Sequence, residues 1–481
     1  MANLLIDLSL TSAHAVGATF ADITGMSATV SVNGPGSVVI LMMGLNPIMD
    51  TTGDDCADYR FTHDGAAVGP IVSGFKDQVD KGSGRTLKFA LTGLSAGSHT
   101  FAVQAQNRTG VTDIDTTRVR TFQALEIQTG ASLLVDLATV VADTAPASFA
   151  NLVNLSASAT PAAGSILLFN AGTQLLGTAA NAAADYRFAI DGVRDGPELT
   201  ETQDEVDEAQ GLAMAWAVEG ISAVSHTFSI QWQIRANAPV QDTDRQRIFQ
   251  VVELTTDADL LVDVQSVSAD SAPVAYADMA DMSGTPVIDS TDSIALVLAN
   301  YVQTTQSDIT ADHILSIASV QEGAEVSAWT DGVGAGKADA LLMARGVTGQ
   351  SGATAMSLQW KRRLLISTTD TARPRTFQVI DLKVPGEISA SPDLALTAAA
   401  DLQGVGGISA SAALAITAAA DLQGIGGISA GPALAFTLAA PLTNLQEISA
   451  SPAMAFTLTA ALRNATPVST LTSRHIEKFI N

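Results

Sequence analysis

Apolar and polar residues alternate in short stretches along most of the chain. In HTFAVQAQ, residues 99–106, Phe101 and Val103 fall on one side of an extended strand and the two glutamines fall on the other. Such stretches are rich in β-branched and aromatic residues and are separated by Gly, Asn, Asp or Pro, whereas helical periodicity is hard to find. The pattern predicts an all-β protein, with polar residues facing outward from each strand.

The same strand-like phrases return at a nearly constant spacing. One octapeptide occurs three times, 127 and then 128 residues apart, as RTFQALEI (120–127), RIFQVVEL (247–254) and RTFQVIDL (375–382). LLIDL, LLVDL and LLVDV head the three copies, and DYRF and SHTF follow in the first two. Markers that keep one order and one spacing indicate tandem copies of a single domain. We predict that the octapeptide is the last strand of each copy, with its phenylalanine packed inward.

A different repeat begins after Lys383. ISA returns at Ile388, Ile408, Ile428 and Ile448, a period of twenty residues, and each copy is followed by an alternating stretch such as LALTAAADL. Alanine favours helix in isolation, so a helical hairpin is an alternative, but the alternation and the Gly- or Pro-containing breaks favour strands. One copy of small side chains buries little, so we expect the copies to stack, with an intertwined homotrimeric shaft supplying further neighbours.

The sequence thus divides into five predicted segments. They are three β-sandwich modules, a shaft of β-repeats and a C-terminal tail, at residues 1–129, 130–256, 257–385, 386–465 and 466–481. The linkers QTGA and TTDA are short, so the last strand of one module and the first strand of the next should lie near one end of the domain.

The tail contains SRHIEKFI, which can form a short amphipathic helix with Ile476, Phe479 and Ile480 on one side. We interpret these three residues as a candidate docking peptide for another protein. A frayed tail is the alternative, because so short a helix is unstable by itself.

Composition and charge exclude several classes of protein. The chain has 481 residues, 47% of them hydrophobic, and a formal net charge of −25, which would repel nucleic acid and anionic membranes. No apolar run is long enough for a transmembrane helix, and MANLLIDLSL lacks the basic residues of a secretory signal. The single cysteine, Cys56, excludes internal disulfides and cysteine-based zinc sites, and we interpret it as a small, semi-buried filler.

Motifs of catalysis are scarce. The chain contains no phosphate loop, no HExxH and no Gly-x-Ser-x-Gly, so we predict neither an enzyme nor a cofactor. His99 and His226 occupy equivalent positions in SHTF, and we interpret them as structural hydrogen-bonding residues. His63 lies beside Asp64, but nothing in the sequence adds a nucleophile or a metal cluster to this pair.

Two further features are candidate sites. The acidic run 198–210 (ELTETQDEVDEAQ) predicts a solvated loop or one helical turn, with a calcium site as the alternative. Trp216, Trp232 and Trp360 have counterparts in other modules and are predicted core residues. Trp329, in SAWTDGVG, has no counterpart and sits among turn residues, so it is the candidate ligand contact.

LLxDL, the SATVSV strand, GSHTF and the closing RxFQxxEL together resemble the jelly-roll modules of bacteriophage fibres. Those modules are similar in fold to the heads of the tumour necrosis factor and complement families, and the twenty-residue repeat resembles phage fibre shafts. The resemblance implies a trimeric, adhesive, non-catalytic virion surface protein, with no receptor-binding residue that can be carried over. GLSAGSHTFAVQAQNRTG also resembles the last hairpin of immunoglobulin-like domains, but 127 residues suit the eight or more strands of a jelly roll better.

We therefore predict a structural fibre or spike protein of a bacteriophage, made in the host cytoplasm and carried on the virion. Its expected partners are two further copies of itself, other virion proteins and a host-surface glycan or protein. One alternative is a head-decorating or tail-structural protein that binds no receptor. Another is a fibre enzyme that cleaves polysaccharide, since a pair of carboxylates can be brought together by the fold alone.

Overall fold

The computed structural model describes most of the chain, which forms two compact units, Ala2–Leu382 and Lys383–Asn481. The described residues of the first unit are 2–48, 55–78, 81–82, 84–110, 113–114, 117–128, 130–176, 182–203, 211–255, 258–304, 309–330, 338–364 and 367–382. In the second unit they are residue 383 and the repeat strands given below. All regular structure in these residues is β-strand, as predicted, and they contain no helix long and apolar enough to span a membrane.

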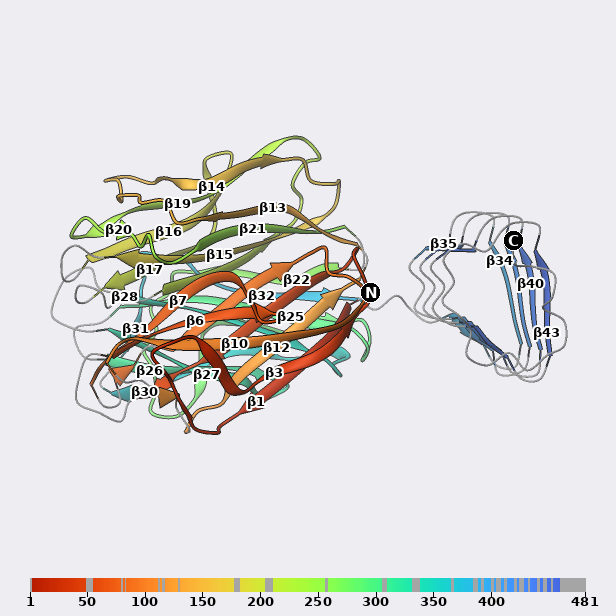
Figure 1. Cartoon of the computed structure of the whole chain (residues 1–481), viewed down its shortest axis with the longest axis horizontal. Helices are drawn as coiled ribbons and strands as arrows, with labels where there is room; N and C mark the ends of the chain where they lie inside the picture. Colours follow the sequence, from red (N-terminus) through yellow and green to blue (C-terminus); the bar gives the residue numbers. More distant parts are fainter. Residues whose placement is uncertain are drawn as a thin grey trace. The chain divides into compact units, whose positions relative to one another are not determined.

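The first module, drawn in red to orange in Figure 1, has the strand order of a jelly roll. Its main described strands are β1 (Ala2–Leu10), β3 (Ala21–Val32), β4 (Val38–Leu45), β6 (Asp55–His63), β7 (Ala66–Gln78), β9 (Arg85–Leu91), β10 (Gly97–Thr109) and β12 (Arg120–Ile127). They form one sheet in the order β1-β12-β4-β9 and a second sheet in the order β3-β10-β6-β7. The first of these main strands therefore lies beside the last, which is the double Greek key of a jelly roll.

The second and third modules repeat this order. The second has β13 (Ala131–Thr139), β14 (Ala150–Ala159), β15 (Ile166–Leu176), β16 (Ala182–Ile190), β17 (Val193–Gln203), β18 (Gly211–Val218), β19 (His226–Ala236) and β21 (Arg247–Leu254). The third has β22 (Ala258–Ser266), β23 (Ala277–Gly284), β25 (Ile294–Thr304), β26 (Ile309–Ile317), β27 (Val320–Thr330), β28 (Ala338–Val347), β30 (Met356–Leu364) and β32 (Arg375–Leu382). Their sheets run β13-β21-β15-β18 with β14-β19-β16-β17, and β22-β32-β25-β28 with β23-β30-β26-β27. The jelly roll is confirmed, and the immunoglobulin-like alternative is wrong.

Short strands complete the three modules. They are β2 (His14–Ala15), β5 (Pro47–Ile48), β8 (Lys81–Gly82), β11 (Asp113–Ile114), β20 (Val240–Gln241), β24 (Val287–Ile288), β29 (Gly352–Ala353) and β31 (Thr368–Thr369).

The repeated octapeptide forms a central strand of each module. β12, β21 and β32 each lie between the first and third main strands, and all eight positions of each are buried. Its phenylalanines, Phe122, Phe249 and Phe377, are fully buried in the three module cores, as predicted. Ala2 pairs with Ile127, and Ala131 pairs with Leu254, so the start of the first strand and the end of the last do lie together.

Each module has its own core between its two sheets. Phe101 and Val103 belong to the core of the first module, as the alternation in HTFAVQAQ predicted. Trp216 and Trp232 are buried in the second and Trp360 in the third, so the three tryptophans predicted to be core residues are confirmed. Cys56 is completely buried rather than semi-buried, and burial raises the pKa of its thiol to about 12.

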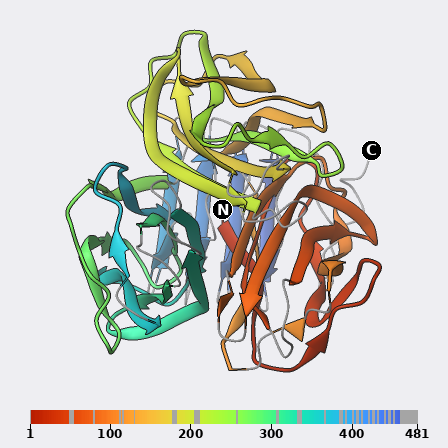
Figure 2. The same ribbon diagram turned by 90° about the vertical axis from the view of Figure 1, so that its left-hand side faces the viewer.

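A fourth core lies where the three modules meet, and we call it the axial core. The sheets that contain β12, β21 and β32 turn their outer faces toward one another, and Figure 2 shows the modules arranged around a common centre. The axial core holds apolar residues of all three modules, among them Val38, Ile40, Leu125, Leu168, Val252, Leu296 and Ile380. One chain thus builds the threefold arrangement that three separate jelly rolls would otherwise have to assemble.

The second unit consists of stacked parallel strands. Each copy of the repeat pairs with the next copy in unshifted register, for example Ile388 with Ile408 and Ile408 with Ile428. The strands are β33 (Ile388–Ala390), β34 (Asp393–Ala398), β35 (Leu402–Gln403), β36 (Ile408–Ala410), β37 (Ala413–Ala418), β38 (Leu422–Gln423), β39 (Ile428–Ala430), β40 (Ala433–Leu438), β41 (Leu442–Thr443), β42 (Ile448–Ala450) and β43 (Ala453–Leu458). The predicted strands and their stacking are confirmed, and the helical hairpin is wrong. Association with other chains stays a prediction.

Candidate functional site

The contacts between the modules centre on the glutamine of the repeated octapeptide. Gln250 of β21 reaches across to Ala90 of β9, an edge strand of the first module. The backbone N–H of Ala90 donates to Oε1 of Gln250 at 2.8 Å, and Nε2 of Gln250 donates to the carbonyl oxygen of Ala90 at 2.8 Å. The carboxamide therefore satisfies both backbone groups of a buried edge residue, as a paired strand would.

The other two module boundaries repeat this contact. Gln378 binds Ala217 of β18 with distances of 2.8 and 2.6 Å, and Gln123 binds Gly346 of β28 with distances of 2.9 and 2.8 Å. The second module thus holds the first, the third holds the second, and the first holds the third. We call Gln123, Gln250 and Gln378 the glutamine clamps.

The aspartate of LLxD orients each clamp. Nε2 of Gln123 donates to Asp7 Oδ1 at 3.0 Å, and Gln250 and Gln378 make the same bond to Asp136 and Asp263 at 3.0 and 3.1 Å. These contacts explain why LLxD and RxFQ return together in the sequence. The motif that heads each module orients the residue with which that module binds its neighbour.

Ion pairs between arginine and aspartate form a second set of boundary contacts. Nη2 of Arg245 in the second module donates a hydrogen bond to Asp58 in the first module at 2.7 Å. Nη2 of Arg373 in the third module donates to Asp185 in the second module at 2.5 Å. Asp312 of the third module is 3.4 Å from Nε of Arg118 in the first, so this pair is looser. These aspartates begin DYRF in the first two modules and occupy the same offset in the third. Because separating one partner from a buried pair is costly, these contacts disfavour other orientations of the modules.

Replacing Gln250 by methionine should lower the free energy of unfolding by about 2 to 3 kcal/mol, because the N–H and C=O of Ala90 would stay buried without partners. Urea unfolding measures this loss. The equivalent changes at Gln123 and Gln378 should cost similar amounts. Gln233→Met, on the other sheet of the second module, is the matched control and should cost less than about 1 kcal/mol. Equal losses at Gln250 and Gln233 would contradict a clamping role.

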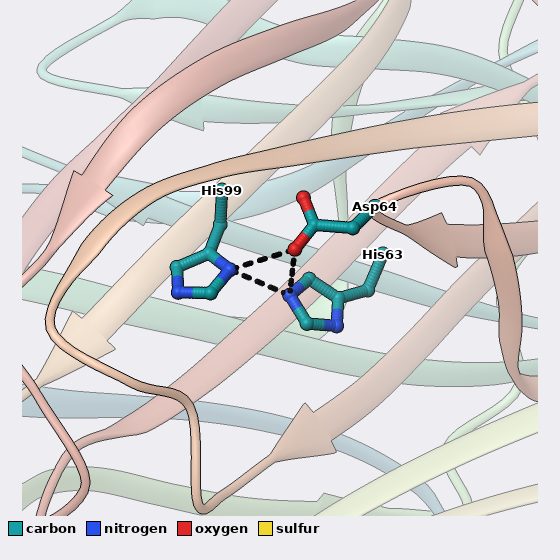
Figure 3. Close-up of side chains that lie close together, drawn as sticks. All are labelled: His63, Asp64 and His99. Carbon is teal, nitrogen blue, oxygen red and sulfur yellow. Dashed lines mark hydrogen bonds and ion pairs between the residues drawn. The ribbon is translucent and has the colours of Figure 1, made fainter.

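Three side chains of the first module converge at one end of β6, and we call His63, Asp64 and His99 the histidine cluster (Figure 3). Asp64 and Gly65 have φ angles of 48° and 80°, which suit the tight hairpin turn between β6 and β7. Asp64 Oδ2 lies 2.9 Å from His99 Nδ1 and 3.1 Å from His63 Nε2. His63 Nε2 lies 2.9 Å from His99 Nδ1.

Hydrogen bonds behind the histidine cluster hold two of its members in place. Asp64 Oδ1 accepts the backbone N–H of Thr100 at 2.7 Å, and this bond, with the one from His99, lowers the pKa of Asp64. His99 Nε2 lies 3.0 Å from the carbonyl oxygen of Ser95. The bonds to Asp64 and then to Ser95 raise the pKa of His99.

The second module keeps part of this arrangement. Asp191 accepts Nδ1 of His226 at 2.7 Å and the N–H of Thr227 at 2.8 Å, and His226 Nε2 lies 3.2 Å from the carbonyl oxygen of Ser222. His99 and His226 thus tie the hairpin turn to the following strand, as structural hydrogen-bonding residues should. Ile190 ends β16 where His63 ends β6, so the second module lacks the second histidine.

The residues predicted as sites do not converge. Trp329 lies in β27 with its backbone paired to Thr310, so it is in a strand and not among turn residues, and its side chain lies outside the described residues. Ile476, Phe479 and Ile480 also lie outside the described residues.

Residues 198–203 of the acidic run belong to a strand, so for this part the predicted loop or helical turn is wrong. Glu198 and Glu201 belong to β17, while residues 204–210 lie outside the described part. Glu201 is buried and accepts Thr173 Oγ1 at 2.9 Å and the N–H of Leu175 at 2.8 Å. Glu198 lies 3.6 Å from Arg194 and from Arg373. Both carboxylates therefore already have protein partners, which counts against their use as calcium ligands.

No protein-family model and no curated protein matches the sequence. Among solved structures, the chain has weak similarity to PNGF-II, with a TM-score of 0.26 and 5% identity over 69% of this chain and 98% of that one. A triple jelly-roll turret protein of an archaeal virus has a TM-score of 0.17 and 7% identity, over 79% of this chain and 89% of that one. A tandem CBM22 domain from Paenibacillus barcinonensis Xyn10C has a TM-score of 0.17 and 9% identity, over 53% of this chain and 94% of that one. These similarities, including the one to the viral jelly-roll protein, are weak. The order of the strands in the chain itself shows an all-β protein of several sandwiches.

Proposed function

We propose that the chain is a non-catalytic structural protein of a bacteriophage particle, a fibre or spike that presents a rigid head of three jelly rolls to the host surface. The observation that carries the proposal is the set of buried contacts that hold the three modules of one chain together. The described boundaries combine the shared axial core with a glutamine clamp and an Arg–Asp pair.

These contacts favour a mechanical role. A buried ion pair adds little net stability compared with apolar packing, but it penalises any arrangement that leaves one charge without its partner. Asp58 and Asp185 are both 1% exposed, so a rotation of one module against its neighbour would leave a buried carboxylate or guanidinium without its partner. A head that resists such rotation keeps its outer loops at fixed distances, which suits adhesion at several points at once.

The stacked repeats support the same role. A strand array that grows by adding identical copies is a way to build length, because each copy contacts mainly its neighbours. In this proposal residues 386–465 act as the shaft. The tail around SRHIEKFI docks on another virion protein.

Locating the protein on particles tests the structural role. Antibodies against the purified full chain should label an appendage or the surface of intact phage particles in electron microscopy. Protein that is abundant in infected cells but absent from purified particles would overturn it.

Adhesion needs its own test. Fluorescently labelled full-length protein should bind host cells saturably and should not bind resistant cells. If it labels particles but binds no cells, the head-decorating or tail-structural role remains. Shortened host polysaccharide after incubation would instead indicate a fibre enzyme.

We further propose that whole chains associate as a homotrimer through the repeat region. The apolar sheet faces of the three modules are already covered within one chain, so this association would use other surfaces. Sedimentation of the full chain should give the mass of three associated chains, while a chain that ends at Lys383 should sediment as a monomer. An equal number of chains per particle for the two proteins would contradict a role of the repeats in assembly.

A further inference from the structure

We propose that His63, Asp64 and His99 form a site for one divalent transition-metal ion of the zinc type in the first module. Neither the structural role nor adhesion requires this site, so the inference stands independently of the proposed function.

The donor atoms have nearly the spacing that such an ion needs. His63 Nε2, His99 Nδ1 and Asp64 Oδ2 lie 2.9, 2.9 and 3.1 Å from one another. Ligands about 2.0 to 2.1 Å from a tetrahedral zinc ion lie roughly 3.3 Å apart, so an outward shift of a few tenths of an ångström would admit the ion. Two imidazoles and one carboxylate are a common ligand set for zinc, with the fourth position left to water or another donor.

The bonds behind the ligands orient them for this role. When His99 Nε2–H donates to the carbonyl oxygen of Ser95 at 3.0 Å, Nδ1 is the nitrogen that faces the cluster. Asp64 is held by the N–H of Thr100 through Oδ1, which leaves Oδ2 directed at both histidines. Hydrogen bonding of a metal-binding histidine through its second nitrogen is typical of metal sites.

A metal ion also resolves a conflict among the three polar atoms. Protons can lie between only some of the three pairs of atoms, so at least one pair sets lone pair against lone pair or proton against proton. One cation between them accepts all three lone pairs at once. The cluster is accessible, because the side chain of Asp64 is 48% exposed and that of His63 is 21% exposed.

The second module provides a comparison within the same chain. Asp191, His226 and Ser222 reproduce the positions of Asp64, His99 and Ser95, but Ile190 replaces His63. The second module therefore keeps two ligands and lacks the third. His63→Ile copies a residue that this fold already accepts, so the variant should fold.

Tag-free full-length protein, stripped with a chelator, is the material for the test. Titration calorimetry with zinc chloride should show one ion bound per chain, and cobalt(II) should give the intense visible absorption of a tetrahedral site. His63→Ile should weaken zinc binding at least about a hundredfold and abolish the cobalt absorption, because one ligand is lost.

His226→Gln is the matched control and should leave both signals unchanged. Zinc bound equally well by wild-type protein and His63→Ile would overturn the proposal, because the ion would then be held elsewhere. So would the absence of binding to wild-type protein. Circular dichroism and thermal unfolding establish that His63→Ile is folded, so that lost binding is assigned to the lost ligand.

Discussion

Replacing Asp185 by asparagine should lower the free energy of unfolding by about 3 to 5 kcal/mol, the usual cost of removing one partner from a buried ion pair. Asp185 is 1% exposed, and it accepts Thr200 Oγ1 at 2.7 Å and Arg373 Nε at 2.9 Å. Arg235 lies 3.5 Å from the same carboxylate. An amide in its place would leave two guanidinium groups near the boundary of the second and third modules without their shared counter-charge. Asp370, 2.8 Å from Arg373, offsets only part of that loss.

Urea unfolding of the full chain measures this effect, and the third boundary supplies the control. Asp312→Asn should cost less, because Arg118 lies 3.4 Å from Asp312 and also 3.7 Å from Glu325. If Asp185→Asn cost less than about 1 kcal/mol, the pair would be solvated and the boundary would not be closed as described.

Replacing Lys88 by methionine should raise the free energy of unfolding by about 2 to 4 kcal/mol at pH 7. Lys88 is 1% exposed and lies two residues before Ala90 on β9, so it points to the same side, toward the axial core. Its Nζ has no hydrogen-bond partner among the described residues, and burial lowers its pKa from 10.5 to about 7. In the other modules the same register position holds Ala215 and Ala344. Methionine keeps the length of the side chain and removes the buried amine.

The effect has a defined pH dependence. Because the pKa of Lys88 is lower in the folded chain, the unfolded chain binds more protons between about pH 7 and 10.5, so Lys88 makes stability rise with pH across that window. Below about pH 7 the amine is charged in both states and its full penalty applies. Lys88→Met should remove this slope, so the stabilisation is largest at or below pH 7 and fades toward pH 10. An unchanged slope in the variant would show that Lys88 reaches solvent or a counter-ion.

Three modules in one chain can differ from one another, which three identical subunits cannot. Lys88 and His63 each occur in only one of the three equivalent positions. A homotrimer of single modules would place three lysines near the axial core, where like charges repel strongly. The tandem arrangement therefore allows a boundary residue or a metal ligand to occur in one module without occurring in the other two.

Much of the fold follows from the sequence. The repeated octapeptide and LLxD predict three copies of one domain, and the alternation in HTFAVQAQ correctly places Phe101 and Val103 in a core. The period of twenty predicts the stacking of the repeats. In each case the prediction rests on the spacing of residues along the chain, because this spacing determines where each residue lies in a strand or in a repeat.

The contacts between modules do not follow from such spacing. Alternation places Gln123, Gln250 and Gln378 opposite the buried phenylalanines, so they are expected to face water, and the structure shows them buried against a neighbour. The continuous apolar run SVVILMM was a signal that strands of this sheet are covered on both faces. Which neighbour covers them depends on docking between modules, and no local pattern contains that information.

The histidine cluster depends on strand register in the same way. His63 and His99 are far apart in the sequence, and they meet because β6 and β10 pair with His63 opposite Phe101. The aligned DYRF and SHTF motifs could have identified these two strands, but not their register. For residues 198–203 the predicted loop is wrong because charge in a sequence does not reveal burial, and Glu201 is buried with hydrogen-bond donors around it.

Amide hydrogen exchange at Ala90, Ala217 and Gly346 tests most directly whether the three jelly rolls close on one another. All three lie on edge strands, so in separate modules their outward N–H groups would face water and exchange quickly. The clamped arrangement predicts protection comparable to that of the central strand β12, with Gln250→Met deprotecting Ala90 and leaving Ala217 and Gly346 protected. Rapid exchange at all three positions in the intact protein would show that the modules stand apart, and it would contradict the account.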